Sequence, residues 1–196
     1  MITRLRKSPY ITDQFRFLFP AIILLCGIMV VVGVFLPWFH VSMSVWILTL
    51  PYSSSGWEMA THNSLFMQVF AYFSNLTFPH AYYMLSAGTL LIVCTLCAFT
   101  ITMVKKEWLN VTVKVQGIAA VMAALYSFGI AVWFLALGSD MNNYFNDSVI
   151  GVDSYGLGYG FYVSTAFSVL ALIAGIIMTK RVFYQTKHYN KEGLLK

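Results

Sequence analysis

The sequence predicts an all-α membrane protein: a left-handed four-helix transmembrane bundle with a small strand-containing first outer loop. The first observation is composition. Of the 196 residues, 59% are hydrophobic and 10% are charged, which is far too apolar for an ordinary soluble domain. The second is that no Lys or Arg occurs between Phe17 and Val104 or between Val115 and Thr179. Because a Lys or Arg at the centre of a membrane helix costs roughly 2.5–3.5 kcal/mol, a hydrocarbon environment imposes such gaps.

Four apolar segments form a single predicted membrane domain over residues 1–196. The predicted spans cover about residues 18–39, 79–104, 115–137 and 157–179. At about 1.5 Å per residue, each crosses a hydrocarbon core about 30 Å thick. Pro20 lies in the first turn of the first span, where a missing N–H is tolerated. Pro79 opens the second span, Gly138 closes the third, and Lys180 follows the fourth.

Four spans place both termini on one side of the membrane. The basic residues gather at the two ends of the chain and between the second and third spans, which predicts that this side is cytoplasmic. The two outer loops, residues 40–78 and 138–156, hold no Lys or Arg. Because the 12 basic residues flank apolar spans, they are interpreted as anchors at the membrane surface, and nucleic-acid binding is not expected.

The first outer loop is predicted to contain a β-hairpin. Apolar residues and serines alternate over residues 41–45, and the run continues to Leu50, as is typical of a strand. Pro51 and a turn at 53–56 close this strand, and a return strand is expected over 57–61. Apolar residues at helical spacing then predict an interfacial helix: Leu65, Phe66, Val69, Phe70 and Phe73. A loop this apolar is expected to pack on the membrane surface or on a partner.

Small residues at heptad spacing mark one face of each of the last two spans. They are Gly117, Ala120, Ala124, Ser127 and Ala131 in the third span, and Ser164, Ser168, Ala171 and Gly175 in the fourth. Small side chains let membrane helices approach closely in left-handed bundles. We therefore expect these two spans to be in closest contact, with Val121 facing lipid. The alternative is that the small residues form an oligomer face or a partner-binding face.

No Asp, Glu, His, Lys or Arg lies deep within any predicted span. Proton-coupled transporters, voltage sensors and most intramembrane hydrolases need such a group at depth, so the sequence predicts neither an enzyme nor a cofactor. Three cysteines inside the spans are interpreted as small packing residues: Cys26, Cys94 and Cys97. Gly156, Gly158 and Gly160 open an apolar span, which favours a flexible helix start over a dinucleotide-binding loop.

Two alternative functions remain open from the residues. His40, His62 and His80 all fall on the outer side and, with Glu58, have the ligand types of a copper or zinc site. Ordinary interfacial histidines with hydrogen bonds are the structural alternative. A pore or carrier for a neutral solute is the other function, and its path would be lined by hydroxyl groups: Ser86, Thr89, Ser127 and Ser164.

Three features resemble the claudin-type tetraspan superfamily, which includes claudins, the peripheral-myelin-protein group and calcium-channel gamma-like subunits. Trp38 follows the first span, Gly56 and Trp57 come after a similar interval, and residues 155–162 are similar at the start of the fourth span. The family's Leu between Gly and Trp and its two paired loop cysteines are missing here. The resemblance implies four spans, cytoplasmic termini and a long first outer loop containing strands.

From these features the sequence predicts a non-catalytic multi-pass membrane protein. Its expected role is that of a structural or accessory subunit of a membrane complex, which acts through helix packing and its apolar outer loop. The expected partners are the lipid bilayer and other membrane proteins or further copies of the same chain.

Overall fold

Four long helices dominate the computed structural model, which describes residues 9–45, 48–61, 79–104, 109–147 and 151–193. The helices are α1 (Pro9–Phe35), α4 (His80–Val104), α5 (Leu109–Asp147) and α6 (Tyr159–Gly193). Each contains a stretch long and apolar enough to cross a membrane: Leu18–Phe35, His80–Ile101, Thr112–Ala136 and Tyr159–Lys180. Large apolar side chains are exposed along all four stretches, as on Leu25, Leu96, Met122 and Ile173. A bundle with an apolar outside and a packed inside is suited to lipid.

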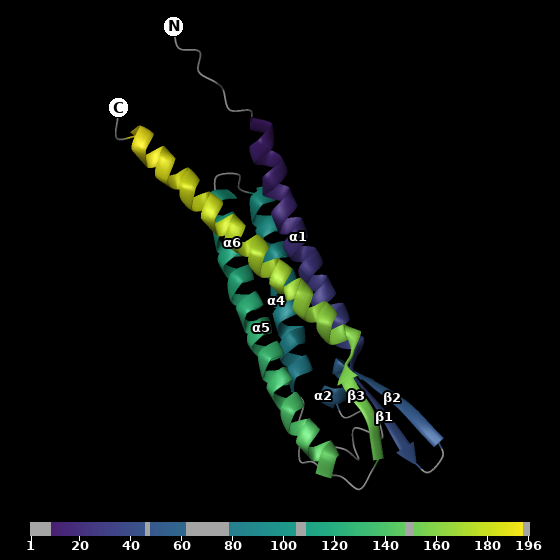
Figure 1. The fold of residues 1–196 in the computed structure, drawn as a ribbon. Helices are drawn as coiled ribbons and strands as arrows, with labels where there is room; N and C mark the ends of the chain where they lie inside the picture. The colour runs from purple at the N-terminus through teal and green to yellow at the C-terminus, as the bar shows by residue number, and fades with distance from the viewer. Residues whose placement is uncertain (1–8, 46–47, 62–78, 105–108, 148–150, 194–196) are drawn as a thin grey trace.

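The helices form a ring in which each packs against the next and α6 closes back onto α1. The pairs α5–α6, α1–α6, α1–α4 and α4–α5 hold nearly all of the contacts between helices, so α1 and α5 lie on one diagonal. Successive helices run in opposite directions (Figure 1). As a result α1 begins and α6 ends at the same end of the bundle, which we call the terminal end. The opposite end, the sheet end, carries all three strands.

The strands β1 (Pro37–Val45), β2 (Leu48–Ser55) and β3 (Gly151–Leu157) form one antiparallel sheet in the order β2-β1-β3. The β1–β2 register runs from the pair Pro37 and Ser55 to the pair Val45 and Leu48. The β1–β3 register runs from the pair Phe39 and Leu157 to the pair Ser44 and Gly151. The connection after the third span therefore contributes a strand to the sheet that the first connection begins.

The predicted fold class is confirmed, but several predicted boundaries were wrong. The sequence places residues 36–39 in the first span, whereas α1 ends at Phe35 and β1 begins at Pro37. The physical reason is Pro37, which has no N–H to donate and disfavours helical backbone in the residue before it. The third span was expected to end just before Gly138, and its apolar stretch does end at Ala136. The helix α5 itself continues to Asp147, because a single glycine weakens a helix by only about 1 kcal/mol.

The predicted hairpin exists, but its two strands pair differently. The second strand, β2, already begins at Leu48 and includes Pro51, which an edge strand tolerates because one side of it needs no N–H donor. The expected return strand over 57–61 is instead the short helix α2 (Gly56–Thr61). A capping box starts this helix, since Glu58 N–H donates to Ser55 Oγ (3.2 Å) and Ser55 N–H donates to Glu58 Oε2 (2.9 Å). The expected interfacial helix at 65–73 lies outside the described residues.

Candidate functional site

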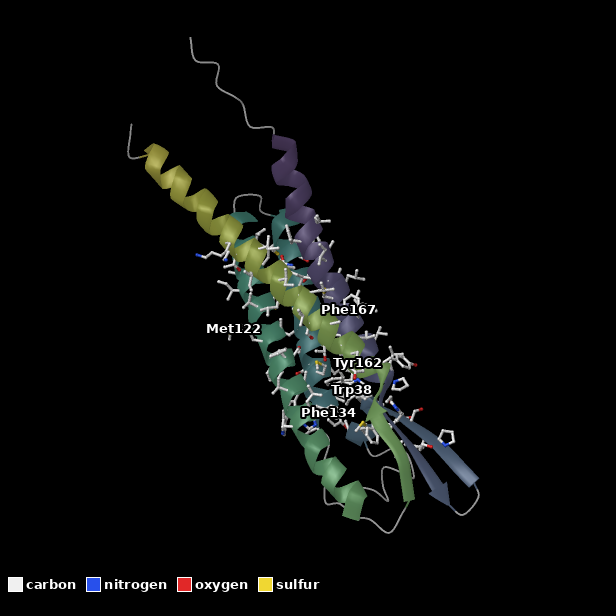
Figure 2. The ribbon with its side chains drawn as sticks, in the orientation of Figure 1. Trp38, Met122, Phe134, Tyr162 and Phe167 are labelled. Atoms are coloured by element: carbon white, nitrogen blue, oxygen red, sulfur yellow. The ribbon has the colours of Figure 1, made fainter. Side chains whose placement is uncertain are left out.

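Trp38 joins the sheet to the bundle. Its indole is 1% exposed and its Nε1–H donates to the Gly33 carbonyl at 2.8 Å. The ring meets Phe134 and Phe161 edge-on, with centroids 5.3 Å and 5.7 Å away, and Figure 2 shows Trp38 beside Phe134 where the bundle meets the sheet. Trp38 therefore ties the first residues of β1 to α1, α5 and α6 together.

Gly56 lies directly against the Trp38 ring. A β-carbon at Gly56 would come within 2.8 Å of the indole carbon Cε2, so no larger residue fits without displacing the tryptophan. Trp57 belongs to a different contact, because its ring packs between Phe35 and Tyr82, each with a centroid 5.6 Å away. Of the three predicted outer-loop residues, the structure thus brings Trp38 and Gly56 together and places Trp57 apart, between α1 and α4.

The three glycines before and inside α6 are sites of close backbone approach, so the interpretation of a flexible helix start was wrong. A β-carbon at Gly160 would lie 2.6 Å from the Leu36 carbonyl oxygen. Gly158 donates its N–H to the Trp38 carbonyl at 2.7 Å. At Gly156 a β-carbon would lie 2.7 Å from the His40 ring. These glycines allow β3 and the start of α6 to press onto the junction of α1 and β1.

The small residues predicted on the last two spans line the contact between α5 and α6. We call Gly117, Ala120, Ala124, Ser168, Ala171 and Gly175 the α5–α6 seam; all six are buried. A β-carbon on Gly175 would lie 2.9 Å from the Gly117 carbonyl oxygen and 3.1 Å from the Ala120 β-carbon. The two helix backbones therefore approach each other most closely at the terminal end of the seam. The expectation that Val121 faces lipid was wrong, because its Cγ2 would lie 3.0 Å from the same Gly175 β-carbon.

The remaining small residues lie nearer the sheet end. Ser164 turns toward α1, since its Oγ donates to the Val30 carbonyl at 3.2 Å, and Ser168 Oγ donates to the Ser164 carbonyl at 2.8 Å. Ala131 belongs to the core around Trp38. Ser127 is fully buried, and its Oγ has no hydrogen-bond partner in the part of the chain that the structure describes.

Sequence reasoning missed one polar contact within the bundle. Gln116 on α5 is 3% exposed and donates from Nε2 to Thr95 Oγ1 on α4 at 3.2 Å, and Thr95 in turn donates to the Leu91 carbonyl at 2.8 Å. Hydrogen bonds of this kind hold neighbouring membrane helices together. The available signal was an amide side chain in the first turns of an apolar span.

The proposed metal ligands do not gather. His40 is exposed and lies against Gly156, and Glu58 caps α2. His80 is 1% exposed, packs 4.1 Å from the Trp133 ring, and has no hydrogen bond at either ring nitrogen within the described ranges, contrary to the expected interfacial histidine with hydrogen bonds. Among the described residues no group of three His, Cys, Asp or Glu side chains is close enough to hold a metal ion. His62 lies outside them.

The hydroxyl groups of the proposed solute path are not brought together either. Ser86 and Thr89 lie on the exposed face of α4, where each donates to a carbonyl of its own helix. Ser127 and Ser164 lie in the core. The cysteines also differ: Cys26 is buried, Cys94 is half-buried and Cys97 is exposed, so the packing interpretation does not hold for Cys97.

The four apolar helices, their apolar outer surfaces and their packed interior define an integral multi-pass membrane protein. Comparison with known protein families and with curated proteins found no match to this chain.

Proposed function

We propose that this protein is a non-catalytic structural or accessory subunit of a membrane complex, with both termini in the cytoplasm and the sheet outside. The single observation that carries this proposal is the two-faced register of the sheet. Cross-strand partners share a face, so Val41 with Tyr52, Met43 with Leu50, and Val45 with Leu48 form one apolar face. The opposite face carries mostly polar residues: His40, Ser42, Ser44, Thr49, Pro51 and Ser53.

The base of the apolar face packs against the bundle. Val41 is buried, and Tyr52 packs against the core around Trp38. The register continues the same face through Leu50 and Leu48, along the hairpin that projects from the bundle in Figure 1. An uncharged apolar strand face is suited to contact with another protein. Another membrane protein or a second copy of this chain is the proposed partner.

The claudin-type resemblance supports the same proposal. Two of the residues that carry it, Trp38 and Gly56, lie in contact although 18 positions separate them in the printed sequence. The motif therefore coincides with a packing unit at the base of the sheet. The resemblance implies four spans, cytoplasmic termini and a long first outer loop containing strands, which is the arrangement proposed here.

The test is gentle solubilisation of the full-length protein, affinity isolation and native mass measurement. We expect a stoichiometric partner or a homo-oligomer. The variant Leu50→Asn should release it, whereas Thr49→Asn, the matched control on the opposite face of β2, should retain it. A strictly monomeric protein without a stoichiometric partner would overturn the proposal. Equal retention by both variants would remove the sheet face as the contact.

A further inference from the structure

The helix α6 continues well past its apolar stretch at the terminal end. That stretch ends at Lys180, whereas the helix ends at Gly193, about 20 Å further along the axis. In Figure 1 this extension projects from the end of the bundle at which the chain begins and ends. Residues 180–193 contain four basic residues and one acidic residue, so the extension carries positive charge away from the edge of the apolar stretch.

Three of these four basic residues share one side of the helix. Because an α-helix has about 3.6 residues per turn, positions 187 and 191 each lie within about 20° of position 180 around the axis. We call Lys180, Lys187 and Lys191 the lysine line. Arg181 lies about 100° away from it. The lysine line thus forms a single row of positive charge along about 17 Å of helix.

The lysine line continues the lipid-facing side of α6. Ile173 and Ile177 lie seven and three residues before Lys180 and are 49% and 37% exposed, and Lys180 is exposed as well. On the other side of the helix, Ala171 and Met178 are buried against the bundle. The helical register therefore places positions 187 and 191 on the side of α6 that faces lipid, beyond the level at which the apolar stretch ends.

No acidic residue of α6 is placed to pair with the lysine line. Ion pairs along a helix form between residues three or four apart, and neither Asp nor Glu occurs at these distances from the three lysines. Lys187 and Lys191 are four residues apart, and like charges at this spacing destabilise a helix. The segments that the topology brings to the terminal end, residues 1–17, 105–114 and 180–196, hold all 12 basic residues and three of the seven acidic ones, which leaves a net charge of +9. A compensating anion is therefore most readily supplied from outside the chain.

The position of the lysine line selects a lipid headgroup as that anion. Lys180 lies at the end of the apolar stretch, and positions 187 and 191 lie about 10 Å and about 17 Å further along the axis. The polar layer on each side of a bilayer is about 5–8 Å thick, and attraction to a charged surface extends roughly 8 Å further. A headgroup with one phosphate therefore meets only the lower part of the line. A headgroup with several phosphates extends further and can contact two lysines that are about 6 Å apart along the axis, as positions 187 and 191 are.

We propose that the lysine line binds the multiply phosphorylated headgroup of an inositol lipid in the leaflet at the terminal end. Lys180 contacts the phosphate that joins the headgroup to the lipid, and Lys187 and Lys191 contact the phosphates on the ring. The orientation given under the proposed function makes this leaflet the cytoplasmic one, so the leaflet assignment rests on that function. The binding itself does not, because it needs only the lysine line and the lipid.

The experiment titrates the full-length protein in detergent micelles with phosphatidylinositol bisphosphate and counts bound lipid by native mass measurement. We expect one tightly bound lipid per chain, with phosphatidylserine bound roughly tenfold more weakly and phosphatidylcholine more weakly still. The double variant Lys187→Gln and Lys191→Gln should weaken the binding of the inositol lipid roughly thirtyfold. The matched control is Lys105→Gln with Lys106→Gln, which removes the same charge between α4 and α5 and should change the affinity by about twofold or less.

Glutamine forms helices about as well as lysine, so both double variants are expected to fold, and their helix content and elution profile check this directly. Equal weakening in the two variants would overturn the proposal, because net charge and not the lysine line would then attract the lipid. Equal affinity for phosphatidylserine would contradict the need for several phosphates. Equally tight binding of soluble inositol trisphosphate would replace the lipid with a free ligand. The absence of a protein partner, which overturns the proposed function, leaves this titration unchanged.

Discussion

At the scale of single residues, two buried side chains with nitrogen donors fill the sheet end of the bundle in opposite ways. Trp38 has its indole N–H bonded to the Gly33 carbonyl, so it combines a large apolar surface with a satisfied donor. His80 is equally buried, but neither ring nitrogen has a hydrogen-bond partner among the described residues. A buried polar group without a partner destabilises the folded state, so the two residues should respond differently to substitution.

Replacing His80 with Leu should stabilise the protein. The change removes two buried nitrogens that have no hydrogen-bond partner in the described part of the chain, and it keeps an apolar side chain of similar size beside Trp133. The expected gain in unfolding free energy is about 1–3 kcal/mol, measured by denaturation in mixed micelles. His40→Leu, at an exposed position, should change stability by less than about 0.5 kcal/mol. A clear loss of stability in His80→Leu would show that the imidazole makes a compensating interaction.

Replacing Gly56 with Ala should destabilise the junction between sheet and bundle. The added methyl group would lie 2.8 Å from the Trp38 ring, and overpacking of this kind costs about 1–3 kcal/mol. Thermal unfolding and the fluorescence of Trp38 should both change. Gly129→Ala is the matched control, because its methyl group meets open space and should raise stability by roughly 0.5–1 kcal/mol. If both alanines behaved alike, the Trp38 contact would not be what requires glycine at position 56.

At the scale of elements, the closest contact between two helices depends on residues that have no side chain or only a methyl group. Gly117 and Gly175 face each other across α5 and α6, and Ala120 packs beside them. Between lipid-embedded helices, van der Waals contact at short range supplies much of the association energy. The α5–α6 seam should therefore tolerate enlargement poorly.

Replacing Ala124 or Gly175 with Leu should force α5 and α6 apart. The expected loss is about 1–3 kcal/mol per site, measured as unfolding free energy in mixed micelles. The control is Met122→Leu, because Met122 is 63% exposed and Figure 2 shows it pointing away from the bundle. Equal tolerance at Ala124 and Met122 would contradict the assigned packing.

At the scale of the whole molecule, the ring of helices and the shared sheet give the protein two unlike ends. Residues from both connections at the sheet end pair with β1, while α1 begins and α6 ends at the terminal end. Lys114 and Lys180 lie toward this terminal end, on α5 and α6. Basic residues favour the cytoplasmic side of a membrane, which gives the orientation a direct test.

Tags at both termini should be inaccessible to antibody in intact cells and accessible after the membrane is permeabilised. A tag inserted between Val45 and Leu48, the residues that end β1 and begin β2, should be reached without permeabilisation. Detection of either terminal tag in intact cells would contradict the proposed orientation.

Much of the candidate site could be predicted from the sequence, because small residues repeated at helical spacing form one face of a helix, and that face allows another helix to approach closely. The six residues of the α5–α6 seam were predicted on this basis, and the structure places all six in buried positions. The prediction that Val121 faces lipid was wrong because sequence spacing gives the order of residues around a helix. It does not give the width of the contact that the neighbouring helix makes. Spacing along one segment also could not show that His80 lies behind Trp133 or that Trp38 lies on Gly56.

The sequence by itself determined the number and approximate extent of the apolar helices, since the cost of charge in hydrocarbon is local to each segment. Only the tertiary structure decided that β3 pairs with β1, more than 100 positions earlier in the sequence, and that three glycines allow this approach. The physical reason is that hydropathy acts residue by residue. Pairing and close packing depend on which distant surfaces meet, and no single segment contains that information.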